Sequence, residues 1–335
     1  MNFLYYIGID ISKATFDFCI LDGTGNEVER GVADNKPDSI VSWINSIEGL
    51  VDWSRTVVCM EHSGFYGANV LQLLDNQTDG VIWLENAVQI KRSMGLQRGK
   101  DDRVDAMRIA LYSLDFQRKI KIWKPSSANI ERLGILISHR DRLVRSRASI
   151  ALGLNEQKGF VGDDLQVEME GVTEAVLMEL DSAITLLEKK IEDLISKDGN
   201  LSRQAKIIRS IPGFGPVISS KVIEVTGGFS RLNNPRAFAC YAGVAPFKHS
   251  SGSSVKGRTR VSHIANKEIK KMIHLAAMVT IRKNGIMRTY YMRKIAEGKN
   301  KMAIINAIRN KLIHILIACI NKDTIYVKNY KKTLD

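Results

Sequence analysis

The sequence predicts an α/β domain over residues 1–125, a helical segment over residues 126–200 and a basic, mostly α-helical domain over residues 201–335. Three observations predict this organisation. Strand and helix patterns alternate up to Pro125, a heptad repeat of apolar residues follows, and the rest of the chain combines helical periodicity with many Lys and Arg residues. Alternating strands and helices are typical of an α/β fold, and 335 residues are enough for two or three domains.

The predicted N-terminal domain begins with antiparallel strands. Residues 5–21 read as two β-strands that form a hairpin, and a turn at residues 22–26 separates them from a third strand at residues 27–33. This order of elements predicts a mixed sheet. Apolar spacing then predicts helices at 37–47, 66–74 and 101–114 and strands at 56–60 and 81–84.

The helical segment contains two long helical patterns. Residues 130–154 form the first, and a glycine-containing break at residues 159–162 separates it from the second. In the second, apolar residues recur at alternating steps of three and four, which is the a/d pattern of a coiled coil. They are Leu177, Leu180, Ile184, Leu187, Ile191 and Leu194. The pattern predicts either an antiparallel helical hairpin within one chain or a coiled coil between chains.

Charge is distributed unevenly along the chain. The net charge is +13; residues 201–335 hold 26 Lys and Arg against 5 Asp and Glu, whereas residues 1–200 hold 23 against 31. A strongly basic half indicates contact with a polyanion such as nucleic acid. A lysine-rich solvated surface would give the same count, so the charge alone does not decide between them.

Other features of the composition argue against several classes of protein. No run of eighteen or more apolar residues without a charge occurs, so we expect no membrane span. We also expect no secretory signal, because the first residues lack a basic segment and a cleavage site. The four cysteines lack C-x-x-C pairing and read as reduced residues of a cytoplasmic protein. They are Cys19, Cys59, Cys240 and Cys319.

Four acidic residues form a candidate metal site. Asp10 interrupts an apolar strand, Glu61 ends a second one, and Asp102 and Asp105 lie three apart on a predicted helix. Asp101 competes with Asp102, because it lies four residues before Asp105. Converging carboxylates repel one another, and hard divalent cations relieve this repulsion. The set fits hard divalent cations, and two such ions about 3.5–4 Å apart serve phosphodiester chemistry. Taken singly, Asp102 or Asp105 on a helix surface would usually be just solvated.

A glycine turn lies between two helical patterns of the basic domain. Its sequence is Ile211-Pro212-Gly213-Phe214-Gly215, and it resembles a helix-hairpin-helix DNA-binding element. Backbone N–H groups near Gly213 and Gly215 at a helix N-terminus would suit a phosphate. A plain interhelical turn would use the same residues.

A second candidate phosphate site is the segment from Ser250 to Arg260. It combines hydroxyls and glycines with Lys256, Arg258 and Arg260, which suits a loop that grips a phosphate. A hydroxyl there could attack a phosphate if another group activates it. By composition alone, a flexible basic loop explains the segment better.

Six motifs follow one another over nearly the whole chain. They are Tyr6-Ile7-Gly8-Ile9-Asp10, Met60-Glu61-His62-Ser63-Gly64-Phe65-Tyr66, Lys100-Asp101-Asp102-Arg103-Val104-Asp105-Ala106, Ser210-Ile211-Pro212-Gly213-Phe214-Gly215, Phe238-Ala239-Cys240-Tyr241-Ala242-Gly243-Val244-Ala245-Pro246 and Ser251-Gly252-Ser253-Ser254-Val255-Lys256-Gly257. Together they resemble the insertion-sequence transposases of the one-ten type, a family that includes the Piv-like DNA invertases.

The resemblance implies a fold and a set of site residues. The expected fold is an N-terminal RuvC-like domain of the ribonuclease H type, a helical coiled-coil segment and a mostly α-helical transposase domain with a helix-hairpin-helix-like element. The family spacing Lys-x-Asp-x-x-Asp-Ala selects Asp102 over Asp101. Its nucleophilic serine falls on Ser251, next to Ser250, which is a competing hydroxyl. The family's four acids fall on Asp10, Glu61, Asp102 and Asp105.

The resemblance also implies a mechanism and partners. Mg²⁺ on the acids would bind the scissile phosphate, and Ser251 would attack it to form a 5′-phosphoserine and a free 3′-hydroxyl. The implied partners are donor and target DNA, a structured noncoding guide (bridge) RNA, and further copies of the chain in a dimer or tetramer. The basic helix is expected to contact RNA or nucleic-acid backbone. Its residues are Arg140, Arg142, Arg145 and Arg147.

Other functions fit parts of the sequence. A metal-dependent endonuclease of the Holliday-junction type would use the same acids with water and leave Ser251 without a task. An actin-like ATPase would use Gly8-Ile9-Asp10, but no second glycine-rich phosphate loop follows at a suitable distance. A non-enzymatic nucleic-acid scaffold would need only the basic half and would keep its function without the acids.

Overall fold

The structure is a computed structural model in which the chain forms two compact units, Met1–Pro125 and Ser126–Asp335. Asp101, which the sequence analysis weighed against Asp102, lies outside the described residues. The described residues are 2–62, 64–93, 102–251, 255–261 and 264–327, and only the backbone is described for residues 102–103, 248–251 and 255–260.

The first unit is built on a five-stranded mixed sheet with the strand order β3-β2-β1-β4-β5. β1 pairs antiparallel with β2 and parallel with β4, which places β1 at the centre. β3 extends the sheet antiparallel beyond β2, and β5 extends it parallel beyond β4. The predicted mixed sheet is confirmed. The strands are β1 (Tyr5–Ile11), β2 (Thr15–Asp22), β3 (Glu27–Asp34), β4 (Thr56–Glu61) and β5 (Val81–Glu85).

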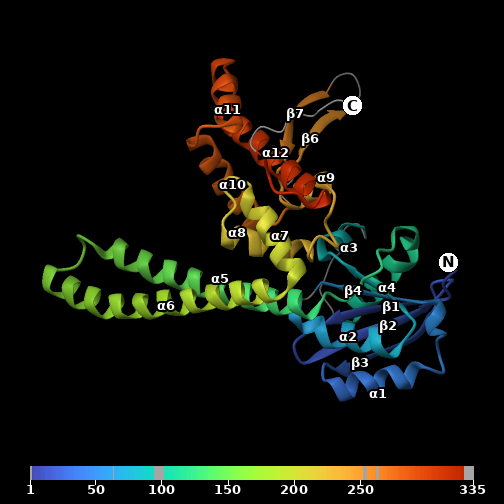
Figure 1. Cartoon of the computed structure of the whole chain (residues 1–335). Helices are drawn as coiled ribbons and strands as arrows, with labels where there is room; N and C mark the ends of the chain where they lie inside the picture. Colours follow the sequence, from blue (N-terminus) through green and yellow to red (C-terminus); the bar gives the residue numbers. More distant parts are fainter. Residues whose placement is uncertain (1, 63, 94–101, 252–254, 262–263, 328–335) are drawn as a thin grey trace. The chain divides into compact units, whose positions relative to one another are not determined.

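Helices cover both faces of this sheet (Figure 1). On one face, Ile7 and Ile9 of β1 form a core with Trp43 and Leu74 from α1 and α2. On the other face, Cys59 and the other strand residues at the alternate positions, whose side chains point away from the first core, pack against α3 and α4. Period-two alternation of side chains separates these two cores. The helices are α1 (Pro37–Ile47), α2 (Ala68–Gln77), α3 (Ala87–Ser93) and α4 (Asp102–Asp115), with 3₁₀ turns η1 (Trp53–Arg55), η2 (Gly64–Gly67) and η3 (Gln117–Lys119).

The second unit begins with two long helices, α5 (Ala128–Gln157) and α6 (Asp163–Lys197), which form an antiparallel hairpin (Figure 1). Ser127 starts α5 by accepting a hydrogen bond from the Ile130 N–H. The six apolar residues of the heptad repeat in α6 are buried or half-buried. Of the two arrangements predicted for this segment, the chain adopts the hairpin; a coiled coil between chains stays a prediction.

The remainder of the second unit is a helical body with one β-hairpin. Segment 246–261, in which the sequence predicted a basic loop, contains two antiparallel strands instead. Backbone pairing between Pro246 and Val261 and between Ser251 and Val255 closes the ladder at its two ends, which a composition-based reading cannot detect. The elements are α7 (Gly199–Ser210), α8 (Pro216–Thr226), α9 (Pro235–Tyr241), β6 (Pro246–Ser251), β7 (Val255–Val261), α10 (Lys267–Arg282), α11 (Ile286–Ala296) and α12 (Lys301–Asn321).

α12 lies in the core of the helical body. Among the described residues it is the one helix long and apolar enough to cross a membrane by length and composition. Ile304, Ile308, Leu312 and Leu316 of α12 are nevertheless buried in the unit's own hydrophobic core, and the helix also buries Arg309. The core helix of a folded domain meets the same criteria of length and composition, and we assign α12 to the core on this burial.

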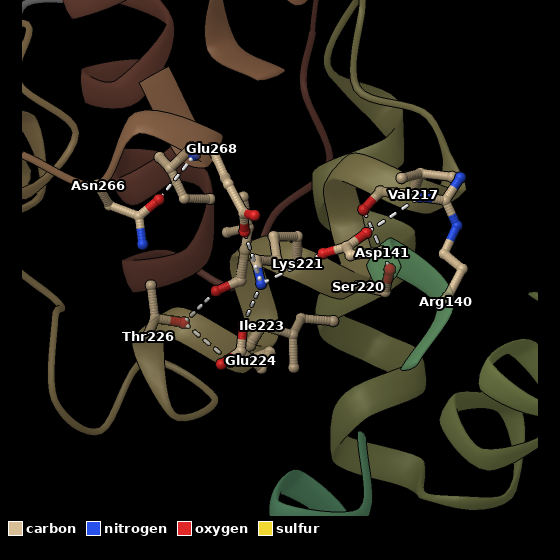
Figure 2. A network of polar contacts seen from close by, with 12 residues as sticks. Arg140, Asp141, Val217, Ser220, Lys221, Ile223, Glu224, Thr226, Asn266 and Glu268 are labelled. Atoms are coloured by element: carbon tan, nitrogen blue, oxygen red, sulfur yellow. Dashed lines mark hydrogen bonds and ion pairs between the residues drawn. The ribbon is translucent and has the colours of Figure 1, made fainter. Parts of the chain in front are cut away.

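An ion-pair network ties the helical hairpin to the body (Figure 2). The Lys221 ammonium of α8 lies 3.7 Å from Asp141 of α5, 3.2 Å from Glu224 and 3.4 Å from Glu268 of α10. The Lys221 side chain is only 11% exposed. Although burial acts in the opposite direction, the three carboxylates raise the pKa of Lys221. Three helices are therefore fixed to one another around a single cation.

Candidate active site

Two of the predicted acids lie at the ends of neighbouring parallel strands. The register of β1 and β4 pairs Ile9 with Met60, so Asp10 and Glu61 follow at the same edge of the sheet. Both occupy the alternate strand positions whose side chains lie on the face of the sheet that α4 covers. Asp10 and Glu61 are half-buried, which is unfavourable for carboxylates unless other groups compensate them.

A glycine allows α4 to approach this face closely. A Cβ built on Gly8 would lie 2.1 Å from the Ala106 oxygen and 2.3 Å from the Ala110 nitrogen. Any side chain at this position would push α4 away from β1. Close packing of α4 on the central strand therefore places the first turn of α4, which starts with Asp102 and contains Asp105, over the sheet.

The charge of Asp105 contributes to the electrostatic environment of Glu61. Burial raises the pKa of Glu61, the negative charge of Asp105 raises it further, and the positive charge of Lys91 on α3 acts in the opposite direction. Asp105 itself forms an ion pair with Arg108, at 2.6 Å between Oδ1 and Nη1. Glu61 and Asp105 thus interact electrostatically, and Glu61 shares its face of the sheet with Asp10.

The donor set suits a hard divalent cation by its chemistry. Asp10, Glu61 and Asp105 offer carboxylate oxygens, which Mg²⁺ prefers, and the repulsion that raises the pKa of Glu61 is what such a cation relieves. Among the residues whose side chains are described, no group of three or more His, Cys, Asp or Glu is arranged to hold a metal ion. The side chain of Asp102, the fourth predicted ligand, is not among them.

Two further acids on the same face were missed by the sequence analysis. Asp17 of β2 is the cross-strand partner of Asp10, and Glu85 of β5 is the register partner of Glu61. Glu85 is 9% exposed and accepts hydrogen bonds from the Tyr112 hydroxyl, at 3.3 Å, and from its neighbour's backbone N–H, at 2.8 Å. Period-two alternation together with the strand order would have located both, but the strand order is not visible in one sequence.

The predicted nucleophile lies on the β-hairpin of the second unit. Ser251 is the last residue of β6 and is paired with Val255, and Ser250 is paired with Lys256. Arg258 and Arg260 lie on β7. The side chains of these serines and basic residues are outside the described part of the structure, so their roles stay predictions.

The glycine turn joins α7 to α8. Gly213 has a φ of +90°, and a Cβ on it would lie 2.6 Å from the Ala276 oxygen of α10, so this position requires glycine. Gly215 is exposed and precedes α8 as its N-cap, with Pro216 at the first helical position. The turn is the predicted interhelical turn; phosphate binding at its backbone N–H groups stays a prediction.

The four arginines predicted to bind nucleic acid differ in their surroundings. Arg140, whose side chain is 15% exposed, pairs with Glu188 at 2.6 Å and with Asp141 at 3.2 Å. Arg142 is exposed and forms no ion pair with another described residue. Arg145 pairs with Glu268 at 3.1 Å, and Arg147 pairs with Asp181 at 2.5 Å.

Acids gathered on one face of a mixed sheet, followed by a helical, strongly basic unit, suit an enzyme that acts on nucleic acid. A profile of DEDD-type IS110 transposases matches residues 7–156, and one described as "Transposase IS116/IS110/IS902 family" matches residues 205–292. The chain thus carries both transposase domains of the IS110/IS116/IS902 family. Its N-terminal unit is a RuvC-like DEDD domain. The chain is a DNA recombinase that depends on a divalent metal.

Two relatives are similar to this chain over most of their length, and a third is similar over about half of its length. A pilin gene-inverting protein of Moraxella lacunata is 26% identical over 329 residues, which cover 95% of this chain and 96% of the relative. The transposase for insertion sequence element IS1111A of Coxiella burnetii is 23% identical over 83% of this chain and 84% of the relative. An insertion element IS900 protein of Mycobacterium paratuberculosis is 28% identical over 56% of this chain and 47% of the relative.

Proposed function

We propose that this chain is the recombinase of a mobile insertion element, which cuts DNA with Ser251 at Mg²⁺ held by the four acids. The observation that carries the proposal is that Asp10 and Glu61 lie near the ends of neighbouring strands on one face of the sheet. The negative charge of Asp105 also raises the pKa of Glu61. This arrangement occurs in a chain that carries both transposase domains. We propose two ions, because two-metal sites stabilise both the attacking and the leaving oxygen of a phosphodiester. The metal ligands would be Asp10, Glu61, Asp102 and Asp105.

In the proposed cleavage step, the Ser251 hydroxyl loses its proton and its Oγ forms a bond to the scissile phosphorus. The bond from phosphorus to the 3′ oxygen breaks, and that oxygen gains a proton to become a 3′-hydroxyl. The 5′-phosphoserine keeps the ester bond, so a 3′-hydroxyl of another strand can attack it and release Ser251 without ATP. Bound Mg²⁺ would neutralise charge on the phosphate during these steps.

The proposal includes partners beyond DNA. A noncoding guide RNA would select donor and target, as the family resemblance implies, and exposed Arg142 is a suitable contact for its backbone. A dimer or tetramer would hold two duplexes for strand exchange. The helical hairpin offers exposed apolar side chains for such an assembly, among them Val167 and Val172, each 69% exposed. The reaction would take place in the cytoplasm.

The experiment is a trapping assay on nicked suicide DNA with the element's own RNA and Mg²⁺. The wild-type protein should form a covalent protein–DNA adduct, Ser251→Ala should form none, and Asp10→Ala should neither cleave nor form an adduct. Ser250→Ala is the matched control, because it removes the neighbouring hydroxyl of the same strand and should keep the adduct.

Two outcomes would contradict the proposal. An adduct that persists in Ser251→Ala would reject its role as nucleophile. Cleavage by the wild-type protein without any adduct would instead favour a metal-dependent endonuclease that uses water. Both outcomes are read from the same denaturing gel.

A further inference from the structure

A pocket of about 810 Å³ lies at the base of the β6–β7 hairpin in the second unit. The first and last hairpin residues, Pro246 and Val261, line it together with Val244, and α10 and α12 contribute the rest. The pocket therefore borders the hairpin that carries Ser251, within the same compact unit.

The charged groups of this pocket are all cations. Lys270 of α10 and Arg309 and Lys311 of α12 line it, together with Asn306 and Asn310, and no acidic residue is among the lining residues that the structure describes. The Lys311 ammonium lies 4.3 Å from the centre of the Tyr290 ring, a contact that does not neutralise its charge. The pocket suits an anionic ligand.

Arg309 is a buried cation that lacks an anionic partner within the described chain. Its residue is only 7% exposed, and its Nε has no hydrogen-bond partner. Its Nη2 donates to Nδ1 of His274 at 2.8 Å, and because a guanidinium cannot accept, this imidazole nitrogen is unprotonated. Burial and the charge of Arg309 lower the pKa of His274, which agrees with a neutral acceptor. A buried guanidinium held by a neutral partner is expected to bind an anion from outside.

A second, smaller pocket adjoins the first at the hairpin base. It has a volume of about 260 Å³ and shares Pro246 and Asn310 with the first. Arg236 and His314 line it without any carboxylate among the described lining residues, and Phe247, 40% exposed, also faces it. A cation such as Arg236 beside an exposed aromatic ring is typical of surfaces that follow a nucleic-acid strand.

We propose that the pocket around Arg309 binds a backbone phosphate of the DNA strand that Ser251 attacks. The proposal rests on the proposed function, because that function places the DNA strand at the β6–β7 hairpin. Arg309 and Lys270 contact the phosphate, Asn306 and Asn310 donate hydrogen bonds, and the strand continues past Phe247. Phosphate contacts of this kind fix the register of a strand without reading its sequence.

The test measures DNA binding without cleavage. Fluorescence anisotropy follows a labelled duplex that carries the element's end, in EDTA and over a range of salt concentrations. Lys270→Gln and Arg309→Gln should each lower the affinity about five- to tenfold and reduce the salt slope by about 0.9, the value for one lost phosphate contact. Lys271→Gln is the control, because it removes the same charge from the next residue of α10, which does not line the pocket. It should bind like the wild-type protein.

Further variants keep the test decisive. Arg309→Lys retains a cation and should recover most of the affinity. If circular dichroism shows that Arg309→Gln does not fold, the DNA affinity of Lys270→Gln alone tests the proposal. Equal losses for Lys270→Gln and Lys271→Gln would overturn the proposal, since they would show a general charge effect. A loss seen on an RNA of the same length but absent on DNA would also overturn it.

The readout separates this inference from the proposed function. Binding is measured in EDTA, so it reports the phosphate contact of the pocket and not the reaction of Ser251. If the pocket variants bind normally while the wild-type protein still forms its adduct, only the pocket proposal fails. If no adduct forms while the pocket variants lose DNA affinity, only the serine mechanism fails.

Discussion

At the scale of single residues, Gly8 determines how closely α4 approaches the central strand β1. The Ala106 oxygen and the Ala110 nitrogen both lie well inside the contact distance of any Cβ at this position. The helix cannot yield locally, because Ala106, Ile109 and Ala110 are buried against the sheet. One hydrogen atom in place of a methyl group thus determines whether the acids of α4 reach those of β1 and β4.

Gly8→Ala should lower the free energy of unfolding by about 1–3 kcal/mol, the usual cost of overpacking a tight core. It should also weaken Mg²⁺ binding, because α4 must move away from Asp10. Urea denaturation measures the first effect and isothermal titration with Mg²⁺ the second. Gly49→Ala is the control, since nothing lies within 4 Å of its Cβ position. Normal stability of Gly8→Ala would contradict the packing argument.

Asp22 stabilises the turn between β2 and β3. Its Oδ1 accepts hydrogen bonds from the backbone N–H groups of Thr24, at 2.8 Å, and Asn26, at 2.9 Å, and from the Thr24 hydroxyl, at 2.6 Å. These hydrogen bonds lower the pKa of Asp22 to about 2, the Thr24 hydroxyl being the largest cause and the Asn26 backbone N–H the second. The ionised form is therefore favoured in the folded state.

The stability that Asp22 contributes should depend on pH with a definite sign. Because its folded pKa is lower than its unfolded pKa, the contribution is fully present above the unfolded value, about 3.9, and is lost as the pH falls towards 2. The difference in Tm between wild-type protein and Asp22→Ala should thus shrink between pH 5 and pH 3. A constant difference over this range would show that ionised Asp22 is not what holds the turn.

At the scale of elements, local patterns predicted most of the first unit. Pro37 and the apolar spacing after it predicted α1 with its observed bounds, and the strand alternation predicted β1 and β2. The β6–β7 hairpin was missed because its strands lack apolar alternation, and only pairing with each other makes them strands. Glu85 was missed for a related reason, since its position beside Glu61 depends on the order of strands in the sheet. Pairing between segments is a tertiary property that one sequence does not display.

The arginines of α5 should separate into two groups when tested. Arg140→Gln leaves Glu188 without its cation and leaves half-buried Asp141 with only Lys221, at 3.7 Å, so it should lower the free energy of unfolding by about 1 kcal/mol. Arg142→Gln should leave stability unchanged and reduce the salt slope of guide-RNA binding by about 0.7. Thermal denaturation and filter binding check the pair. Unchanged RNA binding in Arg142→Gln would remove α5 from the RNA-binding surface.

At the scale of the whole molecule, the proposed site draws its acids from one compact unit and its serine from the other. Such a site can be completed within one chain or between two chains of an oligomer. Symmetric exchange of strands between two duplexes favours the second arrangement, because each subunit can then hold one duplex with its acids and cut it with its partner's serine.

Mixing two inactive variants distinguishes these arrangements. Asp10→Ala retains Ser251, and Ser251→Ala retains all four acids, so a mixed dimer with shared sites contains one complete site. After random reassembly from equal amounts, about a quarter of the wild-type adduct should form, since half of the dimers are mixed and each has one working site of two. The adduct must appear on the Asp10→Ala chain, which an affinity tag of different mass identifies on a denaturing gel. No adduct from a mixture shown to exchange subunits would place both halves of the site in one chain. An adduct on the Ser251→Ala chain would instead reject the serine itself.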